Sequence, residues 1–197
     1  DHTKIPVVLI GSSKQEHGFD TVAIQNYEGA FNATEYLIKK KGFKKIAHIT
    51  GPAENYDAFL RKKGFIDACK KNSVSINKSF IVEGNFTIDS GYHGFIQLYG
   101  LPEKPEAIFA ANDMMALGCY DAANYFNVKI PDDISLIGFD DIFISKYINP
   151  GLTTVRVQIE EVGRAAATLL IERLNNSNGK VHSLIKIPTE LIIRNSC

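Results

Sequence analysis

The chain has 197 residues, of which 45% are hydrophobic, and its 22 Lys and Arg balance its 22 Asp and Glu. This composition is typical of a globular chain with one substantial core or two small lobes, and the balanced charge gives no indication of direct nucleic-acid binding. The apolar runs are far shorter than the roughly 20 residues that a membrane span requires, so we expect no membrane partner.

The cysteines and histidines are placed where neither metal nor redox chemistry is expected. The cysteines lack C-x-x-C pairing and the histidines lack an i, i+4 pair, so we predict no metal, no cofactor and free thiols in a reducing, cytoplasmic compartment. These residues are Cys69, Cys119 and Cys197, and His2, His17, His48, His93 and His182. We also expect no secretory signal, because the first four residues lead straight into an apolar run, and the missing initial Met indicates that the protein begins upstream.

Strands and helices alternate along the first two thirds of the sequence. Strands at 5–10 and 21–24, separated by a polar loop at 11–18, precede a helix from Asn26, its expected N-cap, to about Lys41. The alternation predicts βαβ units with right-handed crossovers, and hence a doubly wound parallel sheet of the α/β class. Its later members are strands at 45–50, 80–83, 107–111 and 134–138 and helices at 57–71, 89–99 and 113–126.

The pattern changes after Asp141. Residues 143–147 make at most two turns, and 152–156 read as a short isolated strand. A long amphipathic helix is expected at 159–174, followed by a loop at 175–179. Residues 184–194 resemble strand material that is interrupted by Pro188.

Polar and aromatic residues follow the carboxyl ends of the predicted strands. Because such ends meet at one edge of a parallel sheet, these side chains should converge there. Carboxylate, amide and guanidinium groups beside an aromatic face are typical of a site for a polyhydroxylated ligand. The candidate binding residues are Asn55, Asp57, Arg61, Phe86, Asn112 and Asp140.

Each candidate also has a purely structural interpretation. Asp140 and Asp141 could cap the turn that follows them, and Asn112 could serve only as the N-cap of its helix. Arg61 could be a surface arginine, and Phe86 a plug beneath the next helix. These alternatives stay open on the residues alone.

An enzyme that uses Asp140 and Asp141 as acid and base is disfavoured. Neighbouring residues on a strand point to opposite faces, so the two carboxylates should not share one site. The sequence also lacks the G-x-S-x-G, P-loop and G-x-G-x-x-G motifs. We therefore predict no catalytic residues.

Four segments together resemble the lactose/galactose repressor (LacI/GalR) family of bacterial transcription regulators. The resemblance extends over essentially the whole chain, through 42–52 and 61–65 as well. The segments are Asn-Asp-Met-Met-Ala-Leu-Gly at 112–118, Ile-Pro-Asp-Asp-Ile-Ser-Leu-Ile-Gly-Phe-Asp-Asp at 130–141, Leu-Thr-Thr-Val-Arg at 152–156 and Glu-Leu-Ile-Ile-Arg at 190–194.

The resemblance implies the effector-binding core of such a regulator, with a periplasmic-binding-protein-like fold. Two lobes would be joined by three crossings, near Asn26, 152–155 and Pro188, with the ligand between them. Residues 26–152 and 189–197 would form a nearly complete C-terminal lobe, and 1–25 and 153–188 the remnant of an N-terminal lobe. The remnant should expose apolar surface, and no residue matches the family's helix-turn-helix headpiece, so DNA would be bound only through that absent headpiece.

By position, the family's effector contacts fall on the same six candidate residues. The resemblance implies that the aromatic ring of Phe86 stacks on the effector, while Arg61 and Asp140 hold its polar groups. A homodimer that senses a sugar or sugar derivative is expected, with a nucleobase or nucleoside as the second choice. Gln25 replaces a usual Asp, so the effector itself is not specified. The alternative function is a periplasmic sugar-binding protein of a transport system.

Overall fold

The computed structural model describes residues 5–11, 18–175 and 182–197. The chain divides into a smaller unit, residues 1–25 and 158–189, and a larger unit, residues 26–157 and 190–197. The loops expected at 11–18 and 175–179, together with His2 and His17, fall wholly or partly outside the described residues.

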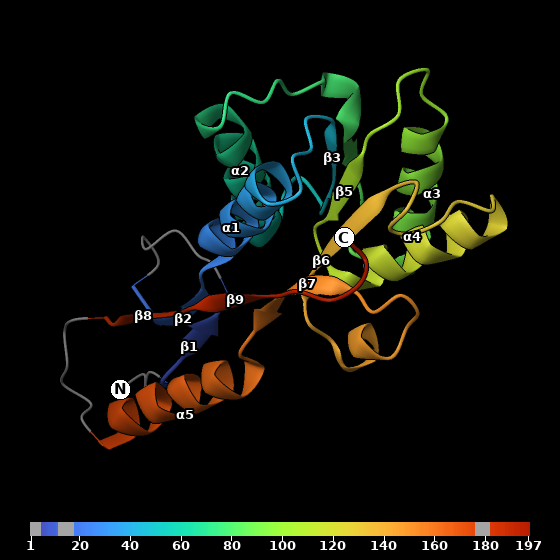
Figure 1. Cartoon of the computed structure of the whole chain (residues 1–197). Coiled ribbons are helices and arrows are strands. Elements are labelled where there is room, and N and C mark those ends of the chain that lie inside the picture. Colours follow the sequence, from blue (N-terminus) through green and yellow to red (C-terminus); the bar gives the residue numbers. More distant parts are fainter. Residues whose placement is uncertain (1–4, 12–17, 176–181) are drawn as a thin grey trace. The chain divides into compact units, whose positions relative to one another are not determined.

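The larger unit is built on a six-stranded sheet in the order β4-β3-β5-β6-β7-β9 (Figure 1). Each neighbouring pair from β4 to β7 is parallel. The strands are β3 (Ile46–Thr50), β4 (Ile81–Glu83), β5 (Ala107–Ala110), β6 (Ser135–Asp140), β7 (Thr153–Val157) and β9 (Thr189–Ile192).

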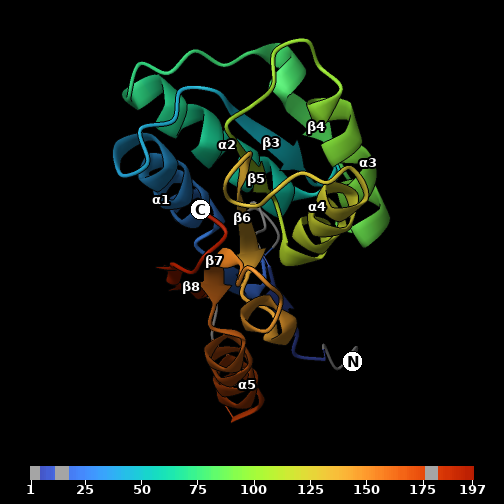
Figure 2. The ribbon, with the colours of Figure 1, turned by 45° about the vertical axis from the view of Figure 1, so that its right-hand side comes forward.

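Two pairs of helices cover this sheet. Helix α1 (Asn26–Lys39) packs on α2 (Tyr56–Lys71), and α3 (Ile88–Tyr99) packs on α4 (Asp113–Tyr125). The first pair lies on one face of the sheet and the second pair on the other (Figures 1 and 2). This arrangement confirms the predicted doubly wound parallel α/β fold.

The central strands are apolar because both of their faces are covered. All residues of β3 and β5 are buried, as is β6 up to Phe139. A strand between two helical layers has no solvent side, so it needs a continuous apolar run rather than an alternating one. This is why short runs such as Ala107–Ala110 could be assigned as strands from the sequence.

His48 is a buried polar residue in the middle of β3. Its ring stacks between those of Phe65 and Phe109, with centroid distances of 5.0 and 4.8 Å. Its Nδ1 lies 2.8 Å from the carbonyl oxygen of Phe109. Burial lowers the pKa of His48 to about 4, so the ring is a neutral part of the core at pH 7.

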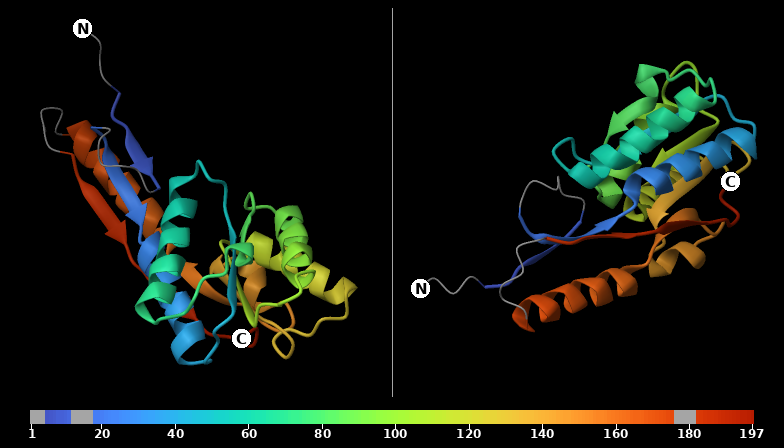
Figure 3. Two further views of the ribbon diagram at one scale, coloured as in Figure 1. Left: turned by 90° about the horizontal axis from the view of Figure 1, so that it is seen from above. Right: turned by 90° about the vertical axis from the view of Figure 1, so that its left-hand side faces the viewer.

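The smaller unit is a three-stranded parallel sheet with one helix. The strands β1 (Val8–Ile10), β2 (Asp20–Ile24) and β8 (Leu184–Ile187) pair in the order β1-β2-β8. Helix α5 (Ile159–Asn175) lies along this sheet (Figure 3). As expected, the unit exposes large apolar side chains, namely Ile5, Val7, Ile10, Phe19, Ile159, Leu170, Ile171 and Leu174.

A buried carboxylate joins the helix of the smaller unit to its sheet. Asp20 is 2% exposed and forms an ion pair with Arg173 of α5. Its Oδ1 also accepts from the backbone N–H of Ser183 at 2.7 Å, next to β8. The contact with Arg173 holds the pKa of Asp20 below its usual value, so this acid stays ionised.

The prediction of an isolated strand at 152–156 is wrong. This strand is β7, and it continues the main sheet by parallel pairing with β6, from Ile137 opposite Thr153 to Asp140 opposite Arg156. It therefore belongs to the larger unit, and the division falls between Val157 and Gln158 rather than after residue 152. A crossover helix between two strands predicts that they pair in parallel, but β6 and β7 are joined by a loop, so the local sequence does not indicate that they pair.

Helices α3 and α4 approach so closely that glycine is required at their contact. A Cβ added to Gly118 would lie 1.9 Å from the backbone oxygen of Ile88, and one added to Gly91 would lie 2.0 Å from that of Met115. Both distances are far inside van der Waals contact with backbone atoms, which cannot rotate away. The packing of this helical layer therefore depends on two missing side chains.

Replacing Gly118 with Ala should force these helices apart. We expect the Gly118→Ala variant to lose about 1 to 3 kcal/mol of unfolding free energy, as overpacked interiors do. Urea unfolding followed by circular dichroism measures this loss. The matched control is Gly163→Ala in α5, where an added Cβ meets nothing within 4 Å and should stabilise the helix by about 0.5 to 1 kcal/mol. Equal losses in both variants would contradict the packing argument.

Candidate functional site

The candidate residues gather at the carboxyl ends of four parallel strands of the larger unit. Asn55 and Arg61 follow β3, Phe86 follows β4, Asn112 follows β5 and Asp140 ends β6. Strand β6 is longer than expected, so Asp140 is its last residue rather than part of the loop. Contacts between these segments bring Arg61, Phe86, Asn112 and Asp140 together, as the next paragraphs describe.

The guanidinium group of Arg61 is the centre of the site. Its side chain is only 7% exposed, and Nη2 lies 3.3 Å from Oδ1 of Asp140. Nη1 donates to the carbonyl oxygen of Ala111 at 2.6 Å, beyond the end of β5. Nε donates to Oδ1 of Asn26 at 2.8 Å. Arg61 is therefore not a surface arginine: it ties together the beginnings of α1 and α2 and the ends of β5 and β6.

Desolvation shifts the pKa values of both Arg61 and Asp140. Desolvation is the largest influence on both groups: it lowers the pKa of Arg61 and raises the pKa of Asp140, and their mutual attraction only opposes these shifts. The pair therefore brings two charged groups into an environment that disfavours both of their ionised forms. Ionisable groups in such an environment are characteristic of binding sites.

Two aromatic rings line the guanidinium group. Its Cζ lies 3.9 Å from the ring centroid of Phe139 and 5.8 Å from that of Phe86. Phe86 has a φ of 68° and a half-buried ring that packs on Gly51, where an added Cβ would come within 2.2 Å of the ring. Phe86 is thus partly a plug, while the rest of its ring stays accessible to a ligand.

The two asparagines of the candidate set both cap helices. Asn112 accepts from the backbone N–H of Met115 at 2.9 Å, and Asn55 accepts from that of Ala58 at the same distance. Asn112 also donates from Nδ2 to the carbonyl oxygen of Phe86 at 3.1 Å, which fixes the loop that carries the aromatic ring. Capping and a place in the site are therefore compatible for Asn112, whereas Asn55 is exposed at the edge.

Asn26 is a site residue that sequence reasoning assigned only a capping role. It is fully buried, and its amide bridges Asp57 and Arg61: Nδ2 donates to Oδ1 of Asp57 at 2.9 Å, and Oδ1 accepts from Arg61. Phe139, whose ring lies against the guanidinium group of Arg61, was not among the sequence candidates. An Asn before a helix and a Phe inside a strand carry no local sign of a shared neighbour, so only the tertiary contacts reveal these two roles.

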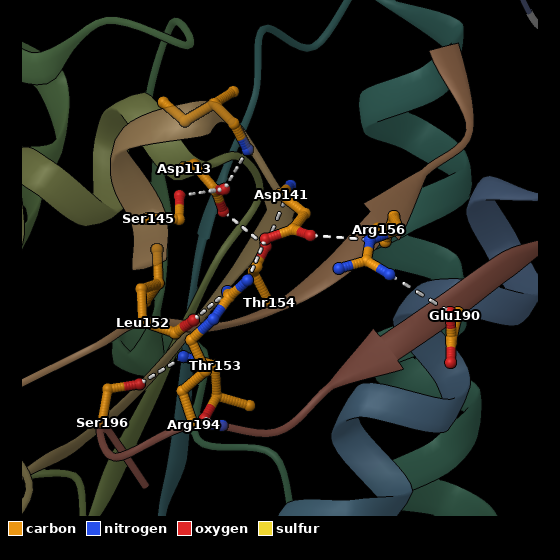
Figure 4. Close-up of polar contacts among 11 residues, drawn as sticks. Asp113, Asp141, Ser145, Leu152, Thr153, Thr154, Arg156, Glu190, Arg194 and Ser196 are labelled. Atoms are coloured by element: carbon orange, nitrogen blue, oxygen red, sulfur yellow. Dashed lines mark hydrogen bonds and ion pairs between the residues drawn. The ribbon is translucent and has the colours of Figure 1, made fainter. Parts of the chain in front are cut away.

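Asp113 holds the turn that follows Asp140. Its Oδ2 accepts from the backbone N–H of Ile142 at 2.9 Å and from Oγ of Ser145 at 2.6 Å, and its Oδ1 accepts from Oγ1 of Thr154 at 2.5 Å (Figure 4). The backbone N–H of Ile142 is thus capped by Asp113, the first residue of α4, and not by the two acids of the turn itself. Space for this carboxylate exists because residue 138 is Gly: a Cβ there would lie 2.2 Å from Oδ1.

Asp140 and Asp141 face different partners. Asp140 lies against Arg61, whereas the carboxylate of Asp141 contacts Arg156 and Arg194, at 2.8 and 2.7 Å. Neighbouring residues that turn to opposite sides cannot act on one substrate atom as an acid and base pair. The sequence-based argument against that arrangement therefore agrees with the structure.

The protonation of Asp113 should make stability depend on pH. Burial raises its pKa from 3.8 to about 6, so between these values the folded protein keeps a proton that the unfolded chain has lost. The contribution of Asp113 to the free energy of unfolding should therefore fall as pH rises from 4 to 6, by about 2 of the roughly 3 kcal/mol that the whole shift gives at 1.36 kcal/mol per pKa unit. The Asp113→Asn variant, which cannot ionise, should gain relative to the wild-type chain over this range.

Urea unfolding of both proteins at pH 4, 5, 6 and 7 measures this difference. Subtracting the two curves removes groups common to both, including His48, whose lowered pKa gives the opposite slope. A stability difference that does not change between pH 4 and 6 would contradict the assignment of a raised pKa to Asp113.

The described residues include neither a metal-binding cluster nor a membrane-spanning helix. Within these ranges, no three His, Cys, Asp or Glu side chains are close enough together to hold a metal ion. No helix there has the length and hydropathy to cross a membrane.

A doubly wound domain with polar groups and an aromatic ring at its strand ends is a ligand-binding domain of the periplasmic-binding-protein type. The sequence profile of the periplasmic binding protein-like domain matches residues 34–197. The HTH-type transcriptional repressor PurR of Histophilus somni is 35% identical over 192 residues, covering 98% of this chain and 57% of the repressor.

Solved structures agree with the profile. A LacI transcriptional regulator from Bacillus cereus subsp. cytotoxis superposes with a TM-score of 0.92 at 32% identity, covering 98% of this chain and 68% of that one. A LacI family regulator from Enterococcus faecium with bound ribose superposes with a TM-score of 0.87 at 26% identity, covering 97% and 70%. The chain belongs to the LacI family of transcription regulators, in which it corresponds to the effector-binding core.

Proposed function

We propose that this chain is the ligand-sensing and dimerising core of a bacterial transcription regulator whose effector is a small sugar or sugar derivative. The observation that carries the proposal is the pair of a buried Arg61 and a half-buried Asp140 beside the half-buried ring of Phe86. Two opposite charges give donors and acceptors for hydroxyl groups, and an aromatic face suits the apolar face of a sugar ring.

The effector contacts that we propose are the six sequence candidates, and the fully buried Asn26 would hold Arg61 and Asp57 in place beneath them. Arg61 and Asp140 would exchange part of their mutual attraction for hydrogen bonds to the effector, which offsets the desolvation of both charges. Asp57 and Asn112 would supply further polar contacts, with Asn55 at the edge. The ribose held by the Enterococcus faecium relative supports a sugar over the second choice, a nucleobase or nucleoside.

The role that we propose is binding without catalysis. A ligand changes the activity of such a protein by binding one conformation better than another, so that the population shifts toward it. The relatives are named as transcriptional repressors, and this chain spans 57% of the length of the first of them. We propose that a helix-turn-helix segment outside this sequence contacts DNA, and that the protein acts in the cytoplasm.

Ligand binding can be tested by thermal unfolding with pentoses, hexoses, sugar phosphates and purines. A compound at 100 times its Kd should stabilise the fold by about 2.7 kcal/mol, which is a shift of several degrees. The shift should fall to a small fraction of its wild-type size in the Asp140→Asn variant, because a neutral amide is a weaker partner than the carboxylate beside Arg61 and leaves only weak binding. It should persist in the matched control Asp132→Asn, which changes an exposed carboxylate on another loop.

The outcomes separate the candidate effectors. A shift with purines alone would replace the sugar by a nucleobase, and a shift that is undiminished in Asp140→Asn would move the site elsewhere. If a folded chain responds to none of the compounds, the small-sugar and purine proposals are both wrong.

The homodimer that we propose would use the turn after β6. The 3-10 helix η3 (Phe143–Lys146) and the next residue present Phe143 and Tyr147, which are 75% and 61% exposed and have ring centroids 4.9 Å apart. Two adjoining aromatic rings on a surface are typical of a protein contact. A second copy of the chain is the occupant that a regulator core with twofold symmetry would supply.

Sedimentation velocity measures this association. The wild-type chain should sediment as a dimer, and a Phe143→Ser/Tyr147→Ser variant as a monomer, because the replacement removes most of the apolar contact. Tyr125→Ser, which alters an equally exposed aromatic on α4, is the control and should stay dimeric. A monomeric wild-type chain, or a dimer that withstands the double replacement, would contradict the proposed contact.

A further inference from the structure

The turn that ends β6 has two consecutive residues in left-handed backbone conformations. Asp140 has a φ of 109° and Asp141 a φ of 54°, and neither is a glycine. Asp adopts the φ of Asp141 more readily than most residues with a Cβ, whereas the φ of Asp140 lies outside the usual left-handed region and is held by its surroundings, as is common at functional sites. The contacts that enforce this turn therefore bear on the direction of the Asp140 carboxylate.

Two arginines hold the carboxylate of Asp141. Its Oδ1 accepts from Nη2 of Arg194 at 2.7 Å, and its Oδ2 accepts from Nε of Arg156 at 2.8 Å (Figure 4). The side chains of Asp141 and Arg194 are 8% and 16% exposed, so their charge-assisted bond is partly shielded from water, whereas Arg156 is 44% exposed and its bond faces solvent. The arginines come from β7 and from the segment after β9, at positions far from Asp141 in the sequence.

The arginines are themselves anchored. Arg194 donates from Nη1 to the carbonyl oxygen of Leu152 at 2.7 Å and from its backbone N–H to Oγ1 of Thr153 at 2.9 Å. Arg156 lies directly opposite Asp140 in the β6–β7 pairing. Asp141 is thus fixed to the two strands beyond β6, while Asp140, one residue earlier, turns the other way toward Arg61.

We propose that Asp141 is a positioning residue for effector binding: its ion pairs with Arg194 and Arg156 hold the turn in which Asp140 meets Arg61. The inference rests on the proposed function, and it extends that function to three residues that need not touch the effector. Without the anchor, the turn can relax to a right-handed backbone, and the Asp140 carboxylate leaves its place beside Arg61.

The substitution Asp141→Asn tests the anchor and leaves the shape unchanged. Asn adopts left-handed backbone at least as readily as Asp, so the variant keeps the side-chain size and the tolerance for φ, and it loses only the charge. With D-ribose as the probe, isothermal titration calorimetry should show affinity reduced about tenfold or more, as for a lost charge-assisted hydrogen bond. The control Glu190→Gln removes a distant, 64% exposed partner of Arg156 at 3.7 Å, and it should leave affinity unchanged.

A double-mutant cycle separates positioning from general destabilisation. If Asp141 acts through Asp140, then Asp141→Asn should cause no further loss of D-ribose affinity in a chain that already carries Asp140→Asn. Losses that multiply, as for independent sites, would overturn the proposal. If Asp141→Asn does not fold, Arg156→Gln replaces it: this residue is 44% exposed and supplies one of the two anchoring bonds, so a smaller loss with the same dependence on Asp140 is expected.

A crystal structure of the Asp141→Asn variant decides the same question without any ligand. The expected result is a changed φ at residue 140 and a carboxylate more than 4 Å from Nη2 of Arg61, against 3.3 Å in the wild-type chain. An unmoved Asp140 would overturn the positioning role. If D-ribose fails to bind the wild-type chain, ribose is not the effector, while the variant structure still tests the anchor.

Discussion

The charge on the guanidinium group of Arg61 is the constraint around which the larger unit is organised. An arginine does not lose its proton inside a protein, so a buried one needs acceptors on every side. Here they are the Asn26 amide, the Ala111 carbonyl and the Asp140 carboxylate, which come from three separate segments. Folding must bring these segments to one point, and the same point is where a polar ligand can exchange for part of the protein's own contacts.

Three acidic residues near Arg61, namely Asp113, Asp140 and Asp141, have different partners. Asp113 is buried and holds backbone and hydroxyl groups, Asp141 is held by arginines, and Asp140 faces Arg61. Their environments differ accordingly: burial raises the pKa of Asp113 to about 6, whereas Asp141 has two cationic partners. Like charges this close together coexist because each has donors of its own.

Four glycines leave space that the candidate site and the helices beside it require. Gly138 leaves room for the Asp113 carboxylate, Gly51 leaves room for the Phe86 ring, and Gly91 and Gly118 let α3 approach α4. Met115, which faces Gly91 in the last contact, lies in the first turn of α4, and Asn112 and Asp113 stand at the start of that turn. Close helix packing on one face of the sheet is therefore connected to the geometry at the strand ends.

The sequence by itself determined the class of fold and the edge of the sheet at which the candidate site residues gather. Alternating short apolar runs and amphipathic stretches can form only βαβ units with buried strands, and Asn55, Arg61, Phe86, Asn112 and Asp140 all follow such runs. These are local properties, since each depends on residues within a few positions of one another. The resemblance to the family then placed the expected effector contacts on the same residues.

The tertiary structure alone decided the partners. Nothing near Asn26 in the sequence indicates Arg61, and nothing near Asp141 indicates Arg194, because these pairs are separated by 35 and 53 positions and meet only through the sheet. The same reason explains the wrong assignment of 152–156 as isolated: a strand's neighbours are set by packing of the whole layer. Position along the chain fixes which chemical groups are available, and long-range packing fixes which of them meet.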